Sequence, residues 1–136
     1  MTIYAYKRHV TREVTRELRL PIDDGRPVGT VLAEVDGVTY IHIPDGFDLP
    51  AEQPAEILDT VRAVDVDAGL RGAIAAASPH VALINARVAQ MISERYGISD
   101  EIKLLRTAPS PEFELYNAFV EDCRAWGREQ KSLIGL

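Results

Sequence analysis

The sequence predicts an α+β fold in which a small antiparallel β-rich module precedes a helical module. The first indication is the stretch "VGTVLAEVDGVTYIHIP" at 28–44, which has the pattern of two strands joined by Asp36-Gly37. The second is the change to helical spacing of apolar residues from about Asp67 onward. A third is the recurrence of serine followed by proline, a combination typical of helix starts.

The length and composition suit a single modest core. The chain has 136 residues, of which 46% are hydrophobic and 26% are charged. The pattern of elements divides it into a β-rich module at 1–44, an acidic, proline-containing connector at 45–66, and a helical module of three to four helices at 67–136.

The amino-terminal stretch contains the tandem "TREVTREL" at 11–18, which fits a strand and a helix about equally well. Because β-branched residues are frequent there, we favour one long edge-type strand that runs from about Val10 and ends at Pro21. The segment "PIDDGRPVG" at 21–29 is then a turn, since Asp-Gly and two prolines disfavour regular structure.

The hairpin at 28–44 is the clearest local signal. Asp36-Gly37 suits the two central positions of a type I′ turn, where positive φ is required. Val31, Ala33 and Val35 are expected to face one way. After Pro44 the segment "PDGFDLPAEQP" has no helical or strand pattern, so it is expected to be irregular and either to lie over another surface or to move freely.

The helical module has explicit start and stop signals. The first helix begins near Asp67 and stops at Ser78-Pro79, and the third begins at Ser99. Ser110-Pro111 starts the last helix. The second helix, at about 79–96 with Gly97 as its stop, has a wide apolar face made of Val81, Ile84, Val88, Met91 and Ile92.

Charge and cysteine content argue against several classes of protein. The net charge is −6, and the acidity is concentrated in the middle of the chain, whereas the first twenty residues are basic. Arg8, Arg12, Arg16 and Arg19 without interleaved aromatic residues are a weak signal for nucleic-acid binding. The chain lacks the apolar run of a membrane span and the pattern of a signal peptide. With one cysteine, neither a disulfide framework nor a cysteine-rich zinc site is expected.

No residue pattern indicates catalysis, a cofactor or a metal. Cys123 lies beside Glu121 and Asp122, which disfavour its thiolate, so we expect a small core residue. The histidines are scattered singly; His42 with Asp45 is the least unlikely metal seed, although a surface histidine on a hairpin is the simpler interpretation. Acids such as those at 100, 101, 112 and 114 suit first helical turns without any substrate.

The carboxyl half resembles small proteins from the tails of bacteriophages and prophages. The resemblance lies in residues 77–131, from "ASPHVALINARVAQMISERYGISDEI" to "YNAFVEDCRAWGREQK". The amino-terminal half is also similar to such tail proteins, but its residues match a much less specific pattern. It implies a non-enzymatic tail-fibre assembly chaperone or a small fibre or baseplate component. Such a protein would act in the host cytoplasm during assembly, and the virion tail is a further location if it remains there.

The resemblance implies protein–protein binding to a tail-fibre or baseplate protein, without membrane or cofactor. The apolar and aromatic residues expected to contact that partner are Tyr40, Ile41, Phe47, Leu49, Phe119 and Trp126. Apolar residues cover more of the last helix than one contact requires, which also suggests a homo-oligomer. Two alternatives stay open: a small-molecule or metal-dependent enzyme, and a nucleic-acid-binding accessory protein that uses the basic amino-terminal stretch.

Overall fold

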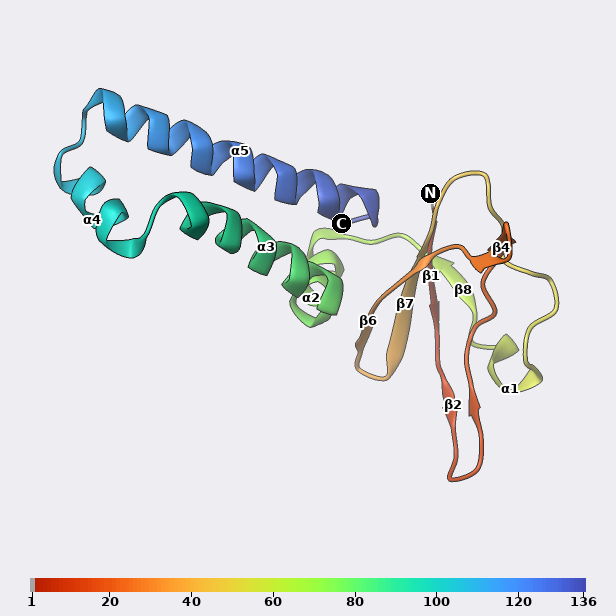
Figure 1. Cartoon of the computed structure of the whole chain (residues 1–136). Coiled ribbons are helices and arrows are strands. Elements are labelled where there is room, and N and C mark those ends of the chain that lie inside the picture. Colours follow the sequence, from red (N-terminus) through yellow and green to blue (C-terminus); the bar gives the residue numbers. More distant parts are fainter. Residues whose placement is uncertain (1) are drawn as a thin grey trace. The chain divides into compact units, whose positions relative to one another are not determined.

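The computed structural model describes residues 2–136 and divides them into two compact units, which are drawn in Figure 1. Unit 1 comprises the chain up to His80 together with Ile134–Leu136, and unit 2 is Val81–Leu133. Strands occupy the amino-terminal half and helices dominate the carboxyl-terminal half. The α+β fold class is therefore confirmed.

Unit 1 is built on an antiparallel sheet with the strand order β6-β7-β1-β8. The strands are β1 (Thr2–Tyr6), β6 (Thr30–Val35), β7 (Val38–Ile43) and β8 (Arg62–Val64). The predicted hairpin is confirmed as β6–β7, with φ of 51° at Asp36 and 79° at Gly37 in its turn. The facing of β6 differs from the prediction, because an irregularity between Val31 and Ala33 turns Val31 outward.

Both faces of the central strand β7 are covered, so unit 1 has a core on each side of its sheet. On one face, Tyr40 packs with Ile74 of α2 (Ala68–Ala77) and with the carboxyl-terminal Ile134 and Leu136. On the other face, Ile41 and Ile43 pack with the connector. The buried members of this second core are Tyr6, Leu18, Ile41, Ile43 and Ile57. Unit 1 is thus a closed body that buries most of its large apolar residues.

The prediction of one long strand from about Val10 to Pro21 is wrong. The chain forms β1 and then a small hairpin of β2 (His9–Val10) and β3 (Thr15–Arg16). The Thr11 hydroxyl accepts a hydrogen bond from the Val14 amide at 3.1 Å, which closes the turn inside the tandem repeat. The predicted turn at 21–29 contains two short paired strands, β4 (Ile22–Asp23) and β5 (Arg26–Pro27), and the chain turns between them at Asp24-Gly25.

The connector belongs to unit 1, so the boundary between the units follows His80 and does not lie at the predicted residues 44 and 66. Phe47 and Leu49 pack against the second core, and the short helix α1 (Ala55–Leu58) buries Ile57 completely. The segment also supplies the edge strand β8. Its proline spacing prevents long regular elements, but its apolar residues still hold it against the sheet.

The remaining helices begin within one residue of their predicted starts. They are α2, α3 (Pro79–Arg95), α4 (Ile98–Arg106) and α5 (Pro111–Leu133), and α4 begins at Ile98 rather than at Ser99. The Asp67 carboxylate accepts from the Leu70 amide at 2.7 Å, and the Ser110 hydroxyl accepts from the Phe113 amide at 3.1 Å. Gly97 serves as the N-cap of α4.

His42 is buried rather than on the surface, contrary to the simpler interpretation of the sequence. Only 4% of it is exposed, and its Nε2 atom has no hydrogen-bond partner among residues 2–136. A Cβ at Gly135, one of the last three residues of the chain, would lie 2.9 Å from the His42 Cδ2 atom. The imidazole is therefore enclosed between the sheet and the carboxyl-terminal residues.

Burial lowers the pKa of His42 below its ordinary value of 6.5. The unfolded chain therefore takes up a proton at this side chain at a higher pH than the folded chain does. The contribution of the neutral His42 side chain to the free energy of unfolding has its full value above about pH 6.5. It decreases as the pH falls below that value. We expect His42→Leu to reduce the loss of thermal stability between pH 7 and pH 5, measured by circular dichroism.

The same substitution is expected to leave stability at pH 7 unchanged or slightly higher, because it removes a buried nitrogen that lacks a partner. His9 and His80 remain in both proteins, so the difference between the two pH profiles reports His42 alone. An identical pH dependence in the His42→Leu variant and the native chain would contradict this account of the buried imidazole.

Candidate protein-binding surface

Cys123 and Asp100, two residues considered for chemistry, occupy structural positions in the fold. Cys123 is 6% exposed and lies on the buried side of α5. The Asp100 carboxylate accepts a hydrogen bond from the Gly97 amide at 3.1 Å, as expected for an acid in a first helical turn. Within residues 2–136, no three His, Cys, Asp or Glu side chains are grouped to hold a metal ion.

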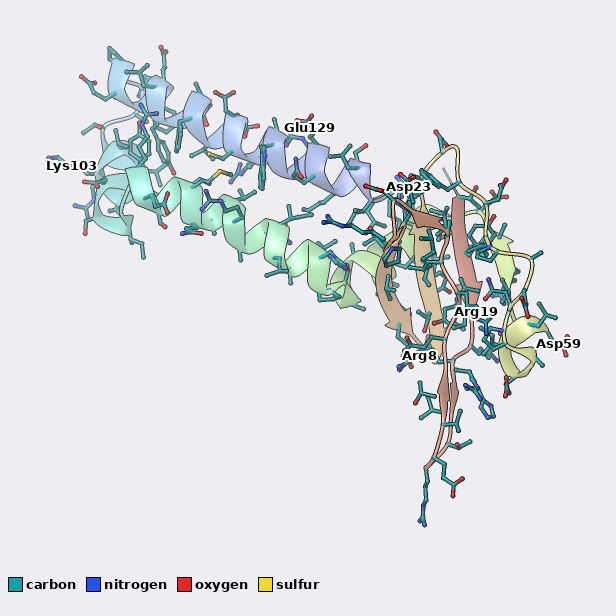
Figure 2. All side chains as sticks on the ribbon, turned by 45° about the vertical axis from the view of Figure 1, so that its right-hand side comes forward. Arg8, Arg19, Asp23, Asp59, Lys103 and Glu129 are labelled. Atoms are coloured by element: carbon teal, nitrogen blue, oxygen red, sulfur yellow. The ribbon has the colours of Figure 1, made fainter. Side chains whose placement is uncertain are left out.

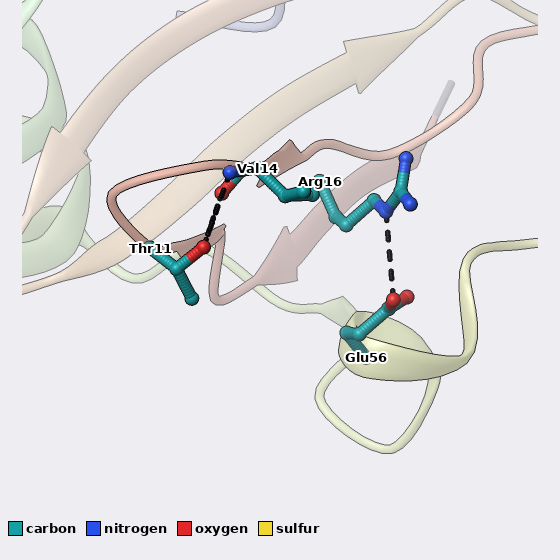
Figure 3. A network of polar contacts seen from close by, with 4 residues as sticks. All are labelled: Thr11, Val14, Arg16 and Glu56. Atoms are coloured by element: carbon teal, nitrogen blue, oxygen red, sulfur yellow. Dashed lines mark hydrogen bonds and ion pairs between the residues drawn. The ribbon is translucent and has the colours of Figure 1, made fainter.

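Two of the amino-terminal arginines are paired with carboxylates. Arg8 lies 2.6 Å from Glu34 and 3.6 Å from Glu17. Arg16 Nε lies 3.4 Å from Glu56 Oε1, next to the Thr11–Val14 turn (Figure 3). The nucleic-acid alternative requires a continuous positive face, and these carboxylates interrupt it.

A cavity of about 220 Å³ lies beside the Arg8 ion pairs in unit 1. Tyr6 lines it, and burial raises the pKa of that phenol. Thr39 also lines it, with its Oγ1 atom buried and without a hydrogen-bond partner in the described part of the chain. The charged side chains at the cavity, Arg8, Glu17 and Glu34, are already paired with each other.

Four of the predicted partner contacts lie in unit 1, and the structure places them in or against its core. Tyr40 is 7% exposed and Ile41 is 1% exposed, so neither offers a surface to a partner in this fold, and their assignment as anchors is corrected. Phe47 and Leu49 are half-buried against the second core. The burial of both faces of β7, which alternation alone does not reveal, accounts for the difference.

Unit 2 is an antiparallel pair formed by α3 and α5, with α4 between them in the chain (Figure 1). The predicted apolar face of α3 packs toward α5, and side chains fill the space between the two helices in Figure 2. At Gly127 of α5 an added Cβ would lie 2.8 Å from Val88 Cγ2 and 3.8 Å from Ile84 Cγ2, both of α3. Glycine therefore allows the two helices to approach at this point.

An aromatic cluster joins the ends of α3 and α5. The rings of Tyr96 and Tyr116 meet edge to face with centroids 4.9 Å apart, and Phe119 is 5.7 Å from Tyr96. Arg95 covers the Phe119 ring at 4.6 Å. The Tyr116 hydroxyl donates to Glu101 at 3.0 Å, and burial together with this carboxylate raises the pKa of Tyr116. The cluster fixes α4 against α5.

One flank of α5 combines exposed and half-buried apolar side chains. We call it the α5 stripe; it consists of Leu115, Phe119, Trp126 and Leu133. Successive members are four or seven residues apart, which places them along one line of the helix. Leu115 is 67% exposed and Leu133 is 65% exposed. Asp122 and Glu129 lie between them along this line, and Glu129 is labelled in Figure 2.

The second exposed apolar surface of unit 2 is on α4. We call it the α4 face; it consists of Ile98, Ile102 and Leu105, which are 79%, 48% and 61% exposed. The spacing of four and three residues aligns them on one side of the helix. No residue of α4 is buried. The chain therefore leaves more apolar surface on unit 2 than its own packing covers.

Comparisons with known proteins found no relative. No protein-family model, curated protein or solved structure matches the chain. Among residues 2–136, no helix has the length and apolar character needed to cross a bilayer.

The closeness of α3 and α5 predicts opposite effects of one substitution at two helical glycines. Replacing a mid-helix glycine by alanine ordinarily stabilises a protein by about 0.5–1 kcal/mol. We expect this gain for Gly72→Ala in α2, where an added Cβ meets nothing within 4 Å. Gly127→Ala should instead destabilise by about 1 kcal/mol, because the new methyl group overlaps the stiff Val88 side chain.

Urea unfolding followed by circular dichroism gives both free energies of unfolding. The double variant Gly127→Ala/Val88→Ala should recover part of the loss, because the truncated Val88 no longer occupies the space of the added methyl group. Equal stabilisation by Gly72→Ala and Gly127→Ala would show that α3 and α5 are not in tight contact at Gly127.

Proposed function

We propose that the chain is a non-enzymatic protein of bacteriophage tails that binds a tail-fibre or baseplate protein through unit 2. It serves as an assembly chaperone or as a small component of the fibre or baseplate. The resemblance to tail proteins lies in residues 77–131, and the contact-defined unit 2 spans nearly the same residues, Val81–Leu133. The part of the chain that carries the resemblance is thus one compact body.

The observation that carries the proposal is the α5 stripe. Both core clusters of the described residues lie in unit 1. Unit 1 also exposes large apolar side chains such as Val10 and Ile22, but the four most exposed ones in the described chain, at 83, 98, 115 and 133, lie in unit 2. Each such side chain gains about 1.5–3 kcal/mol when it leaves water. Two exposed leucines with two half-buried aromatic residues between them form a row that a partner helix or strand can cover.

The aromatic residues of the α5 stripe also suit binding energetics. Tryptophan is enriched among residues that dominate binding energy, and such residues usually lie where surrounding side chains exclude water. Phe119 is held in place by Tyr96 and Arg95, so its ring is ordered before a partner arrives. An ordered contact surface loses less conformational entropy on binding than a flexible one.

Co-expression with the tail-fibre and baseplate proteins encoded beside this chain tests the proposal. We expect one of them to co-purify with the native protein. Leu115→Lys and Leu133→Lys should each weaken this binding about tenfold or more, because each places a charge in an apolar contact. Leu83→Lys is the matched control, since Leu83 is 70% exposed in the same unit but lies on α3.

Unchanged affinity of both α5 variants for the co-purified protein would refute the α5 stripe as its binding surface. Absence of any co-purifying tail protein would refute the tail function itself. Mass spectrometry of purified particles then separates the two roles, because a component remains in the virion and a chaperone is lost.

A further inference from the structure

The α4 face is a surface separate from the α5 stripe, and charged residues border it on both sides. Glu101 lies along one edge of Ile98, Ile102 and Leu105, and Arg106 lies along the other edge. Glu101 accepts a hydrogen bond from Tyr116 through Oε2, which fixes its position beside the face. Arg106 is exposed and has no ion-pair partner among residues 2–136.

The spacing of these residues is that of a parallel coiled coil. If Ile102 is assigned to heptad position a, then Ile98 and Leu105 occupy d positions, Glu101 occupies g, and Arg106 occupies e. In parallel pairs of helices, a g residue faces the e residue five positions later on the partner helix. Glu101 and Arg106 are five positions apart and carry opposite charges.

We propose that the α4 face binds the α4 face of a second copy of this chain, with the two helices parallel around a two-fold axis. Ile98, Ile102 and Leu105 of each copy form the apolar seam. Glu101 of each copy pairs with Arg106 of the other, so the symmetry produces two ion pairs. Ile102 at a with Leu105 at d follows the two-stranded pattern, whereas Ile98 at the other d position does not.

Charge complementarity selects this occupant and this orientation. In an antiparallel pair related by a two-fold axis, like edges of the two helices meet, so Glu101 faces Glu101 and Arg106 faces Arg106. Only the parallel arrangement brings opposite charges together on both edges. The exposed residues of the α4 face are already helical, held by the Gly97 cap and the Tyr116 hydrogen bond, so pairing does not require α4 to fold.

Three apolar residues per copy make a small interface, so a weak, reversible dimer is expected. Sedimentation equilibrium of the intact chain over a wide concentration range should show a monomer–dimer equilibrium. Ile102→Asp should raise the dissociation constant about tenfold or more, because it places two carboxylates in the apolar seam. Leu83→Asp, at a similarly exposed site on α3, should leave the dissociation constant unchanged.

Charge substitutions test the orientation. Arg106→Glu should weaken the dimer several-fold, and the double variant Glu101→Arg/Arg106→Glu should restore it. Tyr116→Phe removes the hydrogen bond to Glu101 without a change of charge. Its effect on the dissociation constant is therefore subtracted from the effect of the variant that replaces Glu101. A concentration-independent monomer mass of the native chain, or a dimer indifferent to Ile102→Asp or to Arg106→Glu, would overturn the proposal.

This pairing does not depend on the proposed function. Ile102→Asp leaves the α5 stripe intact, so binding of a tail protein should survive it while the dimer is lost. Loss of tail-protein binding in the Leu115→Lys and Leu133→Lys variants should in turn leave the dimer in place. The two measurements together therefore distinguish a failure of the proposed tail-protein binding from a failure of the proposed dimer.

Discussion

The close approach of α3 and α5 is the constraint on which the properties of unit 2 depend. Two antiparallel helices can bury only the sides that face each other, and Gly127 permits this contact by leaving room for Val88. Val120 and Cys123 lie on the buried side of α5, whereas Leu115 and Leu133 do not. A helical body of this kind has no second layer to cover its outer apolar residues. Their exposure follows from the architecture and is the physical basis for assigning partner binding to this unit.

Unit 1 covers its apolar residues more fully than unit 2, because its sheet is covered on both faces. Helix α2 and the carboxyl-terminal residues cover one face, and the connector covers the other. The cost of this closure is visible at His42, whose Nε2 atom is buried without a partner. Unit 1 therefore has a core that resembles that of an ordinary small domain, and unit 2 does not.

Local signals in the sequence were sufficient for much of the fold. Asp36-Gly37 identified the central hairpin, and Ser110 identified the start of α5, because turn and cap chemistry acts between residues that are close in the chain. The strand β1 and the hairpin after it were missed, since β1 is defined by pairing with β7 and β8 far along the chain. Periodicity carries no information about such long-range partners.

The same distinction applies to the candidate site. Tyr40 and Ile41 were predicted as anchors because they stand beside a segment without regular structure. In the fold, α2 and the carboxyl-terminal residues cover Tyr40, and the connector covers Ile41. Phe119 and Trp126 remain half-buried on α5, where the sequence had grouped them by helical spacing. The α4 face could have been found from the spacing of Ile98, Ile102 and Leu105, but only the structure shows that nothing in the described chain covers it.

Hydrogen exchange of the intact chain, measured alone and in complex with a co-purified tail protein, tests the central claim most directly. If unit 2 is the partner-binding body, amides of α5 should exchange more slowly in the complex, while those of β1 and β7 should be unaffected. Slower exchange confined to unit 1, for example to the β6–β7 hairpin or the connector, would contradict the assignment of partner binding to unit 2.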